Sequence, residues 1–87
     1  MHEFSLITDL MRKIDVIARE QGARRVGGVR VRLGALSHIS PDHFREHFEA
    51  AATGTIAEAA RLDIKALRDE RDPRAQDILL DSVEIEE

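Results

Sequence analysis

The N-terminal part of the chain has the hydrophobic spacing of an amphipathic helix. Between residues 4 and 20, apolar residues recur at intervals of three and four, and charged residues fill the positions between them. This pattern is typical of a helix that buries one face, and Gly22 predicts where it ends. The positions expected on the buried face are Phe4, Ile7, Leu10, Met11, Ile14, Ile17 and Ala18.

Beyond Gly22 the pattern changes to strict alternation. Residues 29–33 alternate between branched apolar side chains and the arginines Arg30 and Arg32. This alternation predicts a half-buried strand whose arginines face solvent. The preceding Gly27-Gly28 pair lacks the spacing of a phosphate-binding loop, so we interpret it as a bulge or as the entry to the strand.

A second helix is predicted to begin at Ser40-Pro41-Asp42. Ser40 is a suitable N-cap, proline fits the first helical position, and an acid in the first turn favours the helix dipole. The helix is expected to end near Ala52, before a Thr-Gly-Thr sequence, and to bury Phe44 and Phe48.

Two further strands follow. Residues 61–66 alternate between apolar and charged side chains, and residues 78–86 form another apolar run. In the second run the apolar side chains change parity, which a bulge near Asp81-Ser82 would explain. Residues 68–77 lie between the two strands and are mostly charged, so an exposed loop is expected there.

The order helix, strand, helix, strand, strand predicts an α/β two-layer sandwich. In this fold two helices cover one face of a small three-stranded sheet. A chain of 87 residues supports one small core, so residues 1–87 are expected to form a single domain.

Composition narrows the function classes. The absence of cysteine excludes disulfides, thiolate zinc sites and a cysteine nucleophile, and a net charge of −4 argues against nucleic acid as the main partner. The first twenty residues contain no apolar run typical of a signal peptide or membrane span, so a cytoplasmic protein is expected. No catalytic motif is present, so we expect no enzymatic activity.

Histidines are the remaining candidates for chemistry. His43 and His47 are four residues apart and share a face of the second predicted helix, with Glu46 nearby. They offer an incomplete metal site, and we assign them to the surface of that helix. His38 lies alone in a predicted loop.

The N-terminus offers a different ligand set. If Met1 is retained, its α-amine, the backbone nitrogen of His2 and the His2 imidazole close two fused chelate rings. Such a planar, nitrogen-rich set suits Ni(II) and Cu(II), and Glu3 or another donor takes the fourth position. The alternative is that these residues are an ordinary frayed terminus.

The N-terminal MHEFSL resembles the MHExS start of the HypA/HybF family of nickel metallochaperones. Residues 29–64, VRVRLGALSHISPDHFREHFEAAATGTIAEAARLDI, resemble a further block of that family, and the closing SVEIEE resembles its last strand. The resemblance implies that His2 and the terminal nitrogens of Met1 bind Ni(II) transiently, and that Glu3 positions the site or meets a partner. It implies a HypB-like GTPase, an apo-hydrogenase large subunit, or both as partners, with urease as the target in some bacteria.

The chain also departs from that family. HypA-like proteins carry a zinc module with two C-x-x-C pairs between the second and third strands, where this chain has the charged loop 68–77. We therefore expect a HypA-like nickel-binding domain without zinc, and prefer a natural zinc-less member over an engineered deletion.

Two functions remain open. The first is a metallochaperone that binds Ni(II) through Met1, His2 and Glu3 for the maturation of a nickel enzyme, with [NiFe]-hydrogenase preferred. The alternative is an adaptor or assembly module that has lost metal binding and keeps the family's docking surface. A homodimer formed through the edges of the sheet is also possible.

Overall fold

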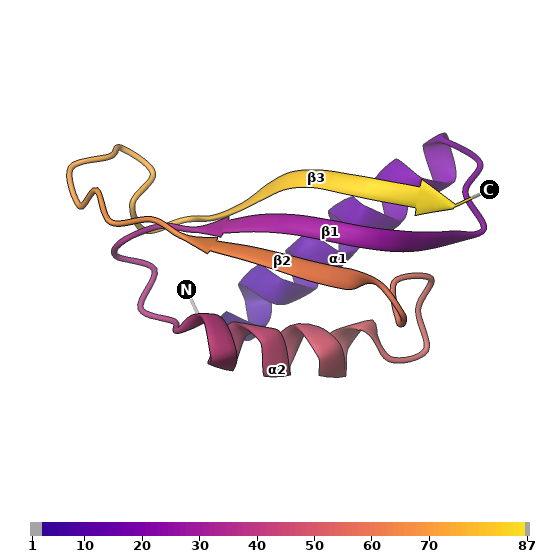
Figure 1. The fold of residues 1–87 in the computed structure, drawn as a ribbon, viewed down its shortest axis with the longest axis horizontal. Coiled ribbons are helices and arrows are strands. Elements are labelled where there is room, and N and C mark those ends of the chain that lie inside the picture. The colour runs from indigo at the N-terminus through magenta and orange to yellow at the C-terminus, as the bar shows by residue number, and fades with distance from the viewer. Residues whose placement is uncertain (1–2, 87) are drawn as a thin grey trace.

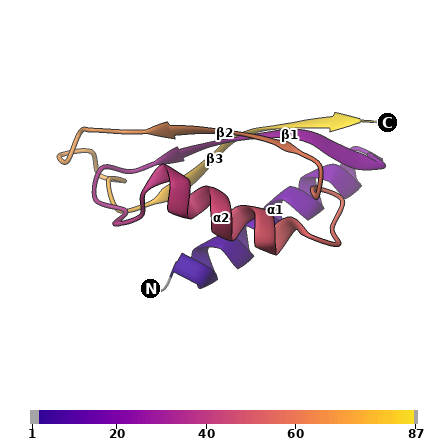
Figure 2. The same ribbon diagram turned by 60° about the horizontal axis from the view of Figure 1, so that its bottom comes forward.

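Two helices and three strands make up the protein. The computed structural model describes residues 3–86. Both helices lie on the same face of the sheet in two views (Figures 1 and 2). The predicted two-layer α/β sandwich is therefore confirmed. The elements are α1 (Glu3–Glu20), β1 (Arg25–Leu33), α2 (Pro41–Ala52), β2 (Arg61–Ala66) and β3 (Ile78–Glu86).

Strand β1 is the centre of the sheet, whose order is β2-β1-β3. It pairs in parallel with β2 and antiparallel with β3. At the end of β1, Leu33 has Ala66 of β2 as its partner on one side and Ile78 of β3 on the other. The segment between β2 and β3 consequently crosses the end of β1.

Two irregularities in the pairing of β1 with β3 confirm the predicted bulges. One shift falls between Val26 and Gly28, and the other leaves Asp81 between the partners of Arg30 and Val31. Strand β1 begins at Arg25, earlier than the alternation from residue 29 predicted. The bulge explains the difference, because the extra residue interrupts the alternation that sequence analysis follows.

The core lies between the helices and β1. Phe44 and Phe48 of α2 are fully buried, as predicted. Ile17 was expected on the buried face of α1 but is 36% exposed, so that prediction was wrong. It lies at the margin of the apolar face, where α1 extends beside β3. The buried hydrophobic residues described in α1, β1 and α2 are Ile7, Leu10, Ile14, Ala18, Val26, Val29, Val31, Leu33, Phe44, Phe48 and Ala52.

Ion pairs cross the strands of the sheet. Arg61 of β2 donates to Glu84 of β3 at 3.0 Å, and Arg25 lies 3.2 Å from Glu86. The carboxylate of Glu84, followed by that of Asp63, raises the pKa of Arg61 above its usual value. These charges are exposed, so each pair contributes little to stability.

The segment between β2 and β3 is folded against the end of β1. The amide of Leu36 donates to the carbonyl of Ala75 at 2.7 Å, and the amide of Gly34 donates to that of Asp77 at 2.9 Å. Ala75 is only 4% exposed, although the residues around it are exposed. Two aspartate turns, in which Asp69 and Asp72 accept backbone N–H bonds, shape the rest of the loop. The predicted exposed loop therefore has one buried anchor.

Gly34→Ala is expected to destabilise the protein by about 1–3 kcal/mol. A Cβ atom at Gly34 would overlap the backbone carbonyl of Ala75, which a side-chain rotation cannot relieve. Gly27→Ala is the matched control, because its new Cβ would meet only the flexible side chain of Glu86. Urea unfolding measures both effects, and equal midpoints for the two variants would contradict the proposed fit of the loop.

Candidate functional site

The N-terminal triplet is the first candidate site. Met1 and His2 lie outside residues 3–86, which the structure describes, and Glu3 is the first residue of α1. The first turn of α1 lies beside α2 in both views (Figures 1 and 2), and the two helices are in contact. The start of α1 is therefore on the same side of the molecule as the helix that carries two of the chain's histidines.

Helix α2 holds its histidines at defined positions. Ser40 caps the helix by accepting a hydrogen bond from the backbone N–H of His43 at 3.2 Å, and Pro41 follows it as predicted. Phe44 and Phe48, each next to one histidine, anchor the helix in the core. His43 is exposed and His47 is half-buried.

The two imidazoles converge. Nε2 of His43 and Nε2 of His47 are 2.8 Å apart, and the ring centroids are 4.5 Å apart. Within the described residues no group of three or more His, Asp or Glu side chains is arranged to hold a metal, so Glu46 does not complete a site with them. His38 lies apart in a loop and adopts a left-handed backbone conformation, with φ of 61°.

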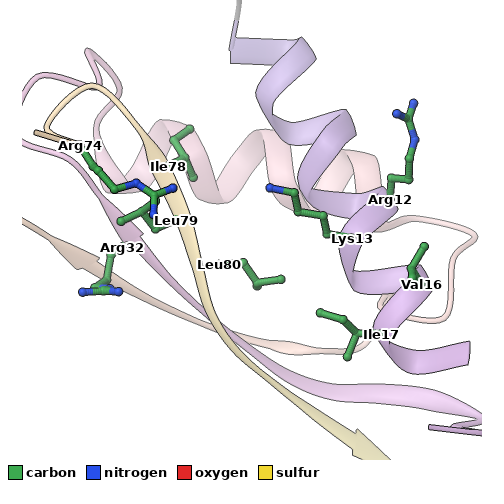
Figure 3. A pocket seen from close by; sticks show the side chains of 9 residues that line it. All are labelled: Arg12, Lys13, Val16, Ile17, Arg32, Arg74, Ile78, Leu79 and Leu80. Atoms are coloured by element: carbon green, nitrogen blue, oxygen red, sulfur yellow. The ribbon is translucent and has the colours of Figure 1, made fainter. Parts of the chain in front are cut away.

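A hollow of about 480 Å³ lies between α1 and β3. Lys13 and Ile17 extend from α1 toward β3 (Figure 3). Ile17 and Val16 are the exposed large apolar side chains of the described part of the chain. We call this hollow the α1–β3 groove. Its lining residues are Arg12, Lys13, Val16, Ile17, Arg32, Arg74, Ile78, Leu79 and Leu80.

The α1–β3 groove combines apolar surface with positive charge. Three of its four cations have carboxylate neighbours: Arg12 is 3.6 Å from Asp9, Arg32 is 3.4 Å from Asp81, and Arg74 is 3.2 Å from Asp77. The remaining cation, Lys13, has no such ion pair within the described residues. The Nε atom of Arg32 is buried, and no atom of residues 3–86 forms a hydrogen bond with it.

Sequence analysis did not find this groove. Val16 lies next to the predicted apolar face of α1. An apolar residue just outside such a face indicates an exposed apolar surface, and this residue could have pointed to the groove. The apolar run from Ile78 to Leu80 was recognised as part of a strand, but its position beside α1 depends on the order of the strands in the sheet, which local patterns do not give. No helix within residues 3–86 has the length and apolar character needed to cross a membrane.

Comparison with known proteins identifies the family. Residues 1–71 match the family described as hydrogenase/urease nickel incorporation, metallochaperone, hypA. The hydrogenase maturation factor HypA of Methylocella silvestris is 48% identical over 64 residues, covering 74% of this chain and 57% of that protein. The HypA protein of Chlorobium limicola is 43% identical over 67 residues, covering 77% and 58%. The matched region therefore spans less than two thirds of these relatives.

The fold agrees with solved structures. The solution structure of the Ni metallochaperone HypA from Helicobacter pylori superimposes with a TM-score of 0.79 at 19% identity, covering 99% of this chain and 98% of that one. The names of these relatives describe a maturation factor and a metallochaperone, not an enzyme. The family match over residues 1–71 and the shared fold lead to one conclusion: this chain belongs to the HypA family.

Proposed function

We propose that this protein is a nickel-binding accessory protein for the maturation of a nickel enzyme, most simply a [NiFe]-hydrogenase. The observation that carries the proposal is that Met1-His2-Glu3 opens a chain whose first 71 residues match a family of nickel metallochaperones. The proposed ligands are the α-amine of Met1, the backbone nitrogen and imidazole of His2, and Glu3 as a further donor or positioning group.

The ligand chemistry supports nickel as the cargo. The chain contains no cysteine, so nitrogen and oxygen atoms must supply the ligands, apart from the thioethers of its two methionines. Amine, amide and imidazole nitrogens in sequence form a planar set, which Ni(II) and Cu(II) accept more readily than Zn(II) does. Because Cu(II) binds such sets at least as tightly, selection of nickel in the cell would depend on metal supply and partner docking.

Delivery is the second part of the proposal. The cargo would pass to a HypB-like GTPase, to an apo-hydrogenase large subunit, or to both. Strands β2 and β3 are the two edges of the sheet. A homodimer through one of these edges stays a prediction, which sedimentation at several protein concentrations would test.

Removing either the histidine or the free amine is expected to abolish tight nickel binding. His2→Ala deletes the imidazole ligand, whereas two residues added before Met1 move the α-amine out of its chelate ring and leave His2 unchanged. His43→Ala and His47→Ala should leave the affinity of this tight nickel binding nearly unchanged. Calorimetric titration of NiCl₂ into untagged protein measures each effect.

Lowering the pH should weaken the tight binding of nickel at the N-terminus. The metal needs an unprotonated amine and imidazole, whose ordinary pKa values are about 7.7–8.0 and about 6.5, so affinity should fall steadily from about pH 8 to about pH 6. Unchanged affinity in the extended protein would rule out the N-terminal chelate.

We also propose that the domain works without a zinc module. In place of that module the chain has residues 68–77, whose Ala75 is buried and hydrogen-bonded to the loop after β1. Such packing supports a natural zinc-less member of the family over a deletion closed by an artificial linker, which would not be expected to fit the protein surface.

A chelator should therefore leave the melting temperature of the purified protein unchanged. A structural zinc site needs about four strong ligands, and the described residues hold no group of three. Thermal unfolding followed by circular dichroism, with and without EDTA, measures this. A large drop on adding EDTA would reveal a structural metal site and contradict the proposal.

The α1–β3 groove favours a second candidate function, that of an adaptor. An apolar hollow whose wall carries Lys13, a cation with no ion pair in the described residues, suits a partly apolar segment of a partner protein that brings a carboxylate to this lysine. If no nickel binds to the native protein, the adaptor function becomes the better explanation of the shared fold and of this groove.

Lys13→Glu should weaken binding to a HypB-like GTPase, mainly at low salt, and leave nickel binding unchanged. The substitution reverses a charge at the wall of the groove, and such charges act chiefly on the association rate. Lys65→Glu, an equivalent change on β2, is the matched control. Surface plasmon resonance at two salt concentrations compares them, and equal effects would show that the groove is not the docking surface.

A further inference from the structure

The histidine pair on α2 has a geometry that neither the proposed function nor the family description uses. His43 and His47 lie one helical turn apart, and their Nε2 atoms are 2.8 Å apart. The planes of the rings are inclined by 43°. The two Nε2 atoms are thus close enough to bind one ion together.

This separation fits a shared metal ion. An ion about 2.0–2.1 Å from each nitrogen would bind them at an angle of roughly 90°, whereas a tetrahedral angle would require nitrogens about 3.3–3.4 Å apart. An angle near 90° is that of neighbouring ligands in a square-planar or octahedral complex, the geometries of Ni(II) and Cu(II). The pair therefore suits these ions better than tetrahedral Zn(II).

The helix prepares the pair for binding. Helix α2 is fixed at its start by the Ser40 cap and along its length by Phe44 and Phe48, which are 0% and 1% exposed. The imidazoles are brought together before any metal arrives, so binding costs little further ordering of the backbone. At present one ring can donate a hydrogen bond to the other through Nε2. Chelation requires both rings to carry their proton on Nδ1, which is a tautomeric change within a neutral ring.

We propose that His43 and His47 form a second, weaker site for Ni(II). Two imidazoles form a less complete chelate than the three nitrogens proposed at the N-terminus, so the ion is held more weakly and is exchangeable. The first turn of α1 lies beside α2 (Figures 1 and 2), which puts this site on the same side of the molecule as the start of the first helix. This second site goes beyond the proposed function and does not depend on it.

The test uses the full chain with His2→Ala, in which the N-terminal chelate is removed. Titration of NiCl₂ into this variant should show one remaining event at the pair, and adding His47→Ala should weaken it by about tenfold or more, since one imidazole cannot chelate. His47→Gln should have the same effect, which separates loss of the ligand from loss of side-chain packing. NiCl₂ should also raise the melting temperature of the His2→Ala protein, because the ion links two turns of α2.

His38→Asn in the His2→Ala background is the matched control, because asparagine tolerates the left-handed conformation at this position. It should leave the remaining event unchanged. Nickel binding that survives both His47 substitutions, or no binding to the His2→Ala protein, would overturn the proposal. If native protein shows only the event that depends on His47, the N-terminal chelate fails and the pair on α2 stands.

Discussion

Within residues 3–86, β1 is the strand that has hydrogen-bonded neighbours on both edges, and every other element is placed relative to it. One face of β1 must also be covered, because Val26, Val29, Val31 and Leu33 are all buried. In a chain of 87 residues few apolar side chains are available for this purpose. The two helices supply them, and their position on one face follows from this need.

The same constraint places the candidate site. Helix α2 reaches the core through Phe44 and Phe48, and this contact fixes which side of the helix carries His43 and His47. Helix α1 lies on the same face of the sheet, so its first turn comes next to α2 (Figure 2). A small core thus brings the first turn of α1 and the histidine helix α2 together on one side of the molecule (Figure 2).

Local patterns predicted most of the fold. Sequence alone predicted the cap at Ser40, the parity change in β3 and the order of the elements, because each depends on residues close together in the chain. The exposure of Ile17 could not be predicted from the sequence, since it depends on how far β3 extends beside α1. Similarly, the spacing of His43 and His47 predicts a shared face, but the 2.8 Å between their nitrogens depends on side-chain rotamers that packing selects.

The pairing at Leu33 has a consequence for how this architecture can change in length. Ala66 and Ile78 flank Leu33 on opposite sides, so the chain leaves β2 and enters β3 two strand spacings apart, about 10 Å. Any folded unit whose own ends lie at a similar distance can be inserted there without moving a strand. The entropy of closing a longer loop grows only with the logarithm of its length. Evolution or protein engineering can therefore add or remove a module at this junction while the two helices and three strands keep their arrangement.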